Sequence, residues 1–278
     1  MMSGPWIARL VVFVAFFDLF AQLPIVAPFA RQLGADPLVT SITVASYDAS
    51  NLLGNLAAGF VLLGLGKHRT LVIGLLVSGM ALALYGIVDS PLQFGVIRAI
   101  HGLGQAVLSP GAFTLLSDSV TAGRRAQAMG TAGAFIAIAA VVGPPLSGIV
   151  ASRTEPEYVF AGVASLMIVA ALVVAYVARW IDHAAPVGDL RSHASDGSLF
   201  EVLLRPQLVV VYVACLAWTA GIGTLVVHLP LLLEARGVPA TARGSAFGLY
   251  ALVALVLFAR PAPWLIDRFG RLRILGTG

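Results

Sequence analysis

Three polar side chains recur at helical spacing within an apolar stretch of the chain. Arg98, His101 and Gln105 lie three and four residues apart, so a helix places them on one face. A guanidinium within hydrocarbon costs about 2.5–3.5 kcal/mol on insertion scales, so Arg98 needs a polar partner or a wet cavity. Histidine exchanges protons near neutral pH, which makes His101 a candidate proton carrier. The alternatives are an Arg98 that snorkels to the membrane interface and a neutral His101 that only packs.

Two carboxylates within apolar runs are further candidates for proton exchange. Asp18 lies one helical turn before Gln22, so the two side chains face the same way. Burial favours the protonated carboxyl and a nearby cation favours the ionised one, so the proton affinity of such a group changes when its cavity opens. We therefore predict a set of proton-coupling residues: Asp18, Asp48, Arg98 and His101.

Asp48 begins a polar stripe along its apolar run. Asn51 and Asn55 follow at spacings of three and seven residues, and Tyr47 lies beside them. The stripe either lines a substrate cavity or forms a structural hydrogen-bond cluster. The predicted cavity residues are Gln22, Tyr47, Asn51, Asn55, Gln105 and Trp218, of which Trp218 also suits packing or anchoring at the interface.

The elements that carry these side chains are indicated by the hydropathy of the chain. Of its 278 residues, 59% are apolar and only 11% are charged, whereas a soluble domain has roughly 25% charged residues. The apolar residues fall in runs that approach or exceed the roughly 20 residues needed to cross a bilayer, without the alternation of barrel strands. We expect an all-α polytopic membrane protein with eight transmembrane helices, over residues 6–29, 40–63, 70–88, 92–116, 128–150, 157–180, 206–233 and 244–265.

The distribution of basic residues predicts the orientation. Of the 17 Lys and Arg residues, eleven fall in loops on one side of the predicted spans and four on the other. The positive-inside rule places the richer side in the cytoplasm, and with it the N-terminus. We expect a multi-pass protein of the cell's inner (plasma) membrane. The positive charge reflects this topology, and nucleic acid is not an expected partner, because no basic run is long or interleaved with aromatic residues.

A short basic turn occurs twice in the same register. Residues 66–71 (GKHRTL) and 270–275 (GRLRIL) each follow a long apolar run, at an offset of 204 residues. A repeat of this length indicates two related halves. We predict an N-terminal six-helix bundle over residues 1–180, a cytoplasmic linker over 181–205 and a partial second bundle over 206–278.

Two of the apolar runs carry further patterns. The fourth reads RAIHGLGQA over residues 98–106, and the fifth contains Gly130, Gly143, Pro144 and Gly148. Small residues let two helices approach closely, and Pro144 with Pro145 removes backbone hydrogen bonds and kinks a helix. The fifth run is therefore either a functional bend or a packing kink without functional consequence.

Together, these patterns resemble the signatures of the major facilitator superfamily, and in particular its drug:proton antiporter branch. The basic turns resemble the family's loop signature, and residues 98–106 are similar to its Arg-x-x-Gln-Gly-x-Gly pattern with His101 in place of glutamine. The fifth run resembles the antiporter motif, which implies a role in preventing leak or setting direction. The resemblance also implies about twelve helices in two bundles, so we expect the chain to be C-terminally incomplete.

The resemblance further implies that the basic turns take part in gating. The residues concerned are Gly59, Gly66, Lys67, Arg69, Asp267, Arg268, Gly270 and Arg271. The first copy has Leu63 where the second has Asp267, so it lacks the acid that the family pattern contains. Asp118, close in sequence to Arg124 and Arg125, is the candidate to replace it.

The leading functional prediction is a secondary transporter that couples proton entry to efflux of small organic compounds by alternating access. Its partners are the lipid bilayer, a small-molecule substrate and protons. The alternatives are an uptake carrier for a sugar, metabolite or organic anion, with Arg98 as the anion contact, and a truncated membrane protein that does not transport. We expect neither an enzyme nor a metal or cofactor site. No span carries paired acids, a His-Glu-x-x-His motif or a Gly-x-Ser-x-Gly elbow.

Overall fold

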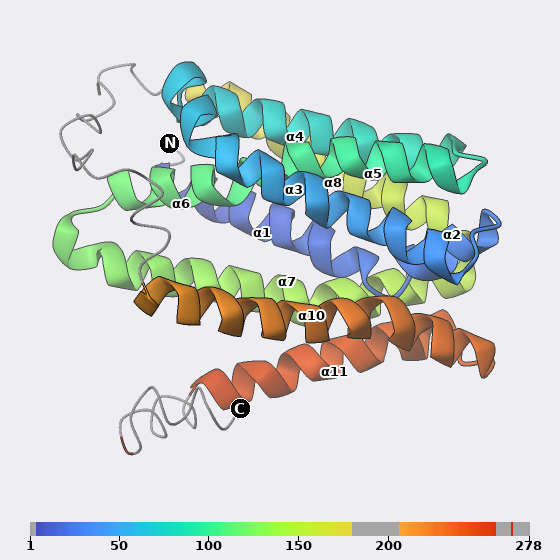
Figure 1. Ribbon diagram of the computed structural model, residues 1–278. Helices are drawn as coiled ribbons and strands as arrows, with labels where there is room; N and C mark the ends of the chain where they lie inside the picture. Colours follow the sequence, from blue (N-terminus) through green and yellow to red (C-terminus); the bar gives the residue numbers. More distant parts are fainter. Residues whose placement is uncertain (1–3, 180–205, 260–267, 269–278) are drawn as a thin grey trace.

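Long helices that run along one common axis make up the described part of the chain (Figure 1). The structure is a computed structural model, and it describes residues 4–179, 206–259 and 268. The predicted linker over 181–205 lies outside the described residues, as do Asp267, Gly270 and Arg271 of the second basic turn. The elements are α1 (Gly4–Gln22), α2 (Val26–Gln32), α3 (Pro37–Leu65), α4 (Lys67–Leu84), η1 (Tyr85–Ile87), α5 (Pro91–Ala106), α6 (Leu108–Asp118), η2 (Ala122–Arg124), α7 (Arg125–Arg153), α8 (Pro156–Ala178), α10 (Pro206–Ala235) and α11 (Ala240–Ala259).

The predicted all-α polytopic architecture is confirmed. Within the described ranges, seven helical segments are long and apolar enough to cross a membrane. The remaining predicted pass is formed by α5 and α6, which follow one another along the length of the bundle (Figure 1).

Two predicted spans are interrupted, and the prediction of single helices over 6–29 and 92–116 was wrong. The first divides into α1 and α2 around Pro24, and the fourth divides into α5 and α6 at Val107, three residues before Pro110. Proline has no N–H to donate to the carbonyl four residues earlier, so the helix ladder is interrupted there. Hydropathy alone does not report such a break, because the residues on both sides are equally apolar.

Local sequence signals explain where several helices begin and end. The side chain of Asp36 accepts a hydrogen bond from the Val39 N–H at the start of α3, and Ser90 does the same for Gln93 at the start of α5. A proline occupies the first helical position in both cases. Gly66 separates α3 from α4 with a φ of +79°, a conformation that favours glycine. This backbone requirement accounts for the glycine of the first basic turn.

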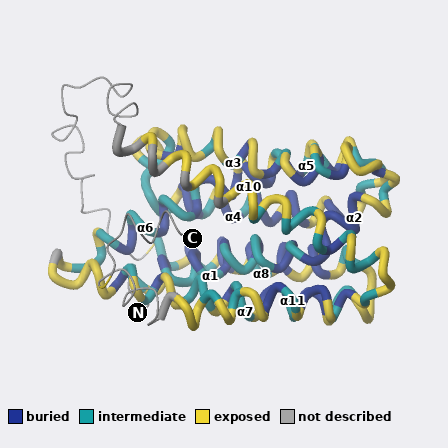
Figure 2. The backbone as a smooth tube through the Cα atoms, turned by 60° about the horizontal axis from the view of Figure 1, so that its bottom comes forward, coloured by how far each residue is buried: buried dark blue, intermediate teal, exposed yellow. Residues whose placement is uncertain are grey.

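The helices bury one another in the middle of the bundle and present apolar side chains outward. α1 packs against α6, α7 and α8, α3 packs against α5, and α4 packs against α5 and α8. Figure 2 shows buried segments turned toward the interior and exposed segments along the outside. The exposed side chains include Leu56 and Phe60 of α3, which are 72% and 79% accessible. A surface of this kind suits lipid, in which the outward face of a helix need not be polar.

The small residues of the fifth apolar run, which forms α7, make close contacts with other helices. α7 continues through Pro144 and Pro145 as one helix and packs against α11. A Cβ added to Gly148 would lie 2.4 Å from the Ala240 carbonyl oxygen, and one added to Gly244 would lie 2.2 Å from that of Pro144.

The same run also approaches α1. A Cβ added to Gly143 would lie 3.2 Å from the Ala21 backbone nitrogen. Gly130 differs, because it is exposed and a Cβ there would meet nothing within 4 Å. Three of the four predicted residues therefore form interfaces.

We predict that the α7–α11 contact tolerates no side chain at position 148. The Gly148→Ala variant should lower the free energy of unfolding by about 1–3 kcal/mol, the usual cost of overpacking, because the clash is with backbone atoms. Gly130→Ala is the matched control on the same helix and should unfold at or slightly above the parent temperature. Thermal unfolding of the two detergent-solubilised variants measures the difference, and equal stability would contradict the packing described for α7 and α11.

Candidate functional site

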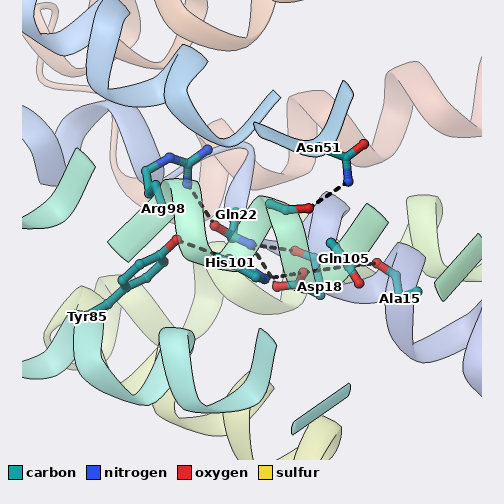
Figure 3. A network of polar contacts seen from close by, with 9 residues as sticks. Ala15, Asp18, Gln22, Asn51, Tyr85, Arg98, His101 and Gln105 are labelled. Carbon is teal, nitrogen blue, oxygen red and sulfur yellow. Dashed lines mark hydrogen bonds and ion pairs between the residues drawn. The ribbon is translucent and has the colours of Figure 1, made fainter. Parts of the chain in front are cut away.

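The Asp18 carboxylate is the centre of a buried polar network between α1 and α5 (Figure 3). It is fully buried, and its Oδ1 accepts a hydrogen bond of 2.7 Å from Gln22 Nε2. Its Oδ2 lies 2.8 Å from Gln105 Nε2 and 3.0 Å from His101 Nε2. Three side-chain nitrogens therefore surround one carboxylate, which is how a buried charge is kept stable away from water.

The orientations of the two glutamine amides are fixed by their other partners. Gln22 Oε1 accepts a hydrogen bond of 3.0 Å from Arg98 Nη1, so the Gln22 nitrogen must face Asp18. Gln105 Nε2 also donates to the Ala15 carbonyl oxygen at 2.8 Å. Both amides thus donate to the carboxylate, which has the hydrogen-bonding pattern of an ionised group.

Arg98 supplies the positive charge of the network. Its Nη2 donates to the Val44 carbonyl oxygen at 3.2 Å, and its guanidinium lies 5.2 Å from the centre of the Tyr47 ring and 5.7 Å from that of Phe94. Arg98 is only 4% exposed. The snorkelling alternative was therefore wrong, because the side chain turns inward. Gln22 bridges Arg98 and Asp18, so the two charges are linked without direct contact.

His101 joins the network to α4 through Tyr85, a residue that the sequence did not single out. The Tyr85 hydroxyl lies 3.0 Å from His101 Nδ1, and both side chains are fully buried. The Tyr47 ring packs edge-on against the imidazole, with centroids 5.1 Å apart. Tyr85 is not spaced from the other site residues as neighbours on one helix face would be. Its membership of the site therefore becomes visible only when α4 and η1 are packed against α5.

Glycines allow α5 to lie close enough to its neighbours to assemble this network. A Cβ added to Gly102 would lie 2.2 Å from the Tyr47 carbonyl oxygen on α3, and one added to Gly104 would lie 2.8 Å from Ser78 Oγ on α4. Across the first contact, Asn51 Nδ2 donates to the Gly102 carbonyl oxygen at 3.1 Å. The glycines of the RAIHGLGQA pattern therefore have a packing role that the spacing of the polar residues does not indicate.

Two of the predicted residues on α3, the proton-coupling candidate Asp48 and the cavity candidate Asn55, lie outside the Asp18 network. Asp48 and Asn55 are exposed on α3, and Asn55 Nδ2 donates to Asn51 Oδ1 at 2.8 Å. The predicted polar stripe is thus partly a hydrogen-bonded pair, and Asp48 takes no part in the hydrogen bonds around Asp18. Trp218 lies in α10, and its side chain is outside those described. Gln22 and Gln105 are nearly buried, so in this conformation they hold Asp18 and do not line an open cavity.

The first basic turn contains an ion pair between helices. Lys67 Nζ at the start of α4 pairs with the Asp118 carboxylate at the end of α6. Asp118 was predicted to replace the missing acid through its proximity to Arg124 and Arg125, whereas in the structure it forms an ion pair with Lys67. Gly59, Arg69 and Arg268 are exposed.

Metal binding finds no support in the part of the chain that the structure describes. Among the described residues, no three His, Cys, Asp or Glu side chains are grouped so that they could hold a metal ion.

A family model described as Major Facilitator Superfamily matches residues 10–278. The chain belongs to the major facilitator superfamily. This superfamily consists of transporters and not of enzymes, in agreement with the interpretation of the sequence. Its fold is also found here: the solved structure of a D-xylose–proton symporter superposes with a TM-score of 0.66 at 16% identity, covering 95% of this chain and 69% of that chain.

Relatives with curated names include multidrug transporters. Multidrug resistance protein 2 of Bacillus subtilis (strain 168) is 22% identical over 204 residues, which are 73% of this chain and 50% of that protein. Multi-drug resistance efflux pump PmrA of Streptococcus pneumoniae is 30% identical over 151 residues, which are 53% of this chain and 38% of that protein. The chain therefore spans half the length or less of each of these two relatives in the matched regions.

We predict that Gly102 is required for the site to assemble. In Gly102→Ala the new methyl group would clash with the Tyr47 backbone and push α3 away from α5, with loss of the bonds from Arg98 to Val44 and from Asn51 to Gly102. Gly95→Ala on the same helix is the control, since a Cβ there would meet Thr43 only at 3.8 Å. Thermal unfolding should separate the variants by about 1–3 kcal/mol. A Gly102→Ala variant as stable as Gly95→Ala would show that α3 and α5 are not so closely packed.

Proposed function

We propose that the complete transporter exports small organic compounds in exchange for protons, and that Asp18 binds the coupled proton. The observation that carries the proposal is the buried Asp18 carboxylate, which is surrounded by hydrogen-bond donors and linked through Gln22 to the buried Arg98 cation. An intramembrane ionisable residue with such partners is by default a candidate functional group.

Protonation of Asp18 would change both the charge and the hydrogen bonding of the network. The negative charge that balances Arg98 would be lost, and one oxygen of the carboxyl would become a donor among groups that now donate to it. The partners on α5 and α1 would then have to rearrange, because an unsatisfied buried donor is costly. A proton that binds here is therefore coupled to the relative positions of α1 and α5, as alternating access requires.

Two observations favour efflux over uptake. The relatives include proteins named for multidrug resistance and multidrug efflux. In addition, Arg98 is buried and bonded to Gln22 and Val44, so in this conformation it offers no contact to an anionic substrate. The alternative remains an uptake carrier for a sugar, metabolite or organic anion. The third candidate is a membrane protein that does not transport in the form of this chain.

In this function the side of the membrane whose loops hold more Lys and Arg residues is the cytoplasmic side, and the N-terminus lies there. The Lys67–Asp118 pair would then hold the cytoplasmic ends of α4 and α6 together in one access state. An exposed ion pair contributes about 0–1 kcal/mol, so we expect its effect in the conformational equilibrium and not in overall stability.

We predict that Asp18→Asn abolishes transport driven by a pH gradient, because an amide cannot take up the proton. Purified full-length chain in proteoliposomes, loaded with a panel of fluorescent amphipathic compounds, provides the measurement, and correct reconstitution is checked by protease protection. Asp48→Asn is the matched control, since Asp48 is exposed and outside the network. Coupling that survives in Asp18→Asn and disappears in Asp48→Asn would transfer the proton site to Asp48. Absence of transport in the unmodified chain would favour the third candidate.

We also predict that reversing the charge at Lys67 lowers the transport rate without a comparable loss of stability. Lys67→Asp alone should slow transport with little change in unfolding temperature, because it sets two carboxylates against each other. The double variant Lys67→Asp with Asp118→Lys restores an ion pair and should recover the transport rate. If the double variant stays as slow as the single one, the pair has no role in access.

A further inference from the structure

We propose that Tyr85 is a positioning residue that holds His101 in its neutral form with the proton on Nε2, so that the exchanged proton is taken up by Asp18 and not by the imidazole. The assignment of an exchanged proton rests on the function proposed above. The protonation state of His101 itself follows from the geometry of the network alone (Figure 3).

The two ring nitrogens of His101 have different partners. Nε2 lies 3.0 Å from Asp18 Oδ2, and Nδ1 lies 3.0 Å from the Tyr85 hydroxyl. A neutral imidazole has one donor and one acceptor nitrogen, and an ionised carboxylate only accepts, whereas a tyrosine hydroxyl can donate. With the proton on Nε2, His101 donates to Asp18 and accepts from Tyr85. Asp18, His101 and Tyr85 are then matched as donor and acceptor without any rearrangement.

A charged imidazolium would leave Tyr85 without an acceptor. In that state Nδ1 also donates, so the Tyr85 hydroxyl would have to accept and turn its own hydrogen elsewhere. The Tyr85 ring packs against the rings of Phe94 and Phe160, with centroids 4.7 and 5.0 Å away. Among the described residues, the structure shows no second hydrogen-bond acceptor for this hydroxyl. A buried hydroxyl without an acceptor is costly, which disfavours the imidazolium.

The charges around His101 oppose one another, so it is the hydrogen bonds of Nε2 and Nδ1 that favour the neutral ring. The charged and titratable groups near His101 are Asp18 from α1, Tyr47 and Asp48 from α3, Tyr85 from η1 and Arg98 from α5. A cation such as Arg98 disfavours a second positive charge beside it, whereas the Asp18 carboxylate 3.0 Å from His101 Nε2 favours one. Asp48 is exposed, and the carboxylate that faces His101 directly is Asp18.

An added proton on Asp18 has an acceptor available after one local change. Gln105 Oε1 is buried and has no hydrogen-bond partner among the described residues. Rotation of the Gln105 amide would turn this oxygen toward the Asp18 hydroxyl and give up the bond to the Ala15 carbonyl. The proton then resides on Asp18 Oδ2, no covalent bond is broken, and the His101–Tyr85 pair is undisturbed.

The test is nitrogen NMR of the full-length chain with ¹⁵N-labelled histidine in lipid nanodiscs. The chain has five histidines, and the signals of His101 are those absent from His101→Gln. In the parent protein we expect a neutral ring protonated at Nε2, which persists between about pH 8 and about pH 5, where an ordinary histidine becomes charged. In Tyr85→Phe we expect loss of the single tautomer and appearance of the imidazolium on acidification.

Tyr47→Phe is the matched control, because the Tyr47 ring contacts His101 while its hydroxyl makes no bond to the imidazole; its His101 signals should match the parent. An imidazolium or an Nδ1-protonated ring in the parent would overturn the proposal, as would an unchanged tautomer in Tyr85→Phe. If Tyr85→Phe does not fold, the parent spectrum alone decides. The NMR result does not depend on transport, so failure of the antiport proposal and failure of this one are distinguishable.

Discussion

The structure depends on the stabilisation of one carboxylate in the middle of an apolar helix bundle. An isolated ionised group transferred to such surroundings is strongly destabilised, and it persists only with hydrogen-bond donors and a counter-charge. Asp18 accepts hydrogen bonds from Gln22 and Gln105, contacts His101 Nε2, and obtains its counter-charge from Arg98 through the Gln22 amide. The position of α5 relative to α1 follows from this requirement, since three of these four side chains belong to α5.

Close backbone contact is the second condition for the network. The carbonyl oxygen of Val44 can accept from Arg98, and the ring of Tyr47 can cover the guanidinium, only because Gly102 lets α3 approach α5. Gly104 allows the same close approach toward α4. Tyr85, the first residue of η1 directly after α4, contacts His101. The polar residues of α5 thus provide the hydrogen-bonding and charged groups. The glycines between them determine which neighbouring helices lie close enough to bind those groups.

A similar arrangement connects α7 with α11 and with α1. Gly148 of α7 and Gly244 of α11 let the two helices approach to backbone distance, and Gly143 extends the contact to α1, the helix that carries Asp18. In a membrane the hydrophobic effect does not drive helix association, so such small-residue contacts supply much of the packing. A shift of α11 against α7 would be transmitted to α1 through packed backbone, and this is a physical route between the α7–α11 contact and Asp18.

The sequence by itself determined the class of the protein, the family pattern and most of the site. Apolar runs of membrane length predicted the helices, and helical spacing predicted that Arg98, His101 and Gln105 share a face and that Asp18 and Gln22 point the same way, because these relations are local. Prolines at positions 24 and 110 divided two of the predicted helices, which hydropathy could not indicate. Tertiary structure alone decided that these faces meet, that Arg98 turns inward and not to the interface, that Asp48 stays outside the network, and that Tyr85 is part of it. The physical reason is that hydrogen-bond partners across helices are selected by close packing at particular glycines, and the distance between two helices is not encoded in the spacing of residues along either one.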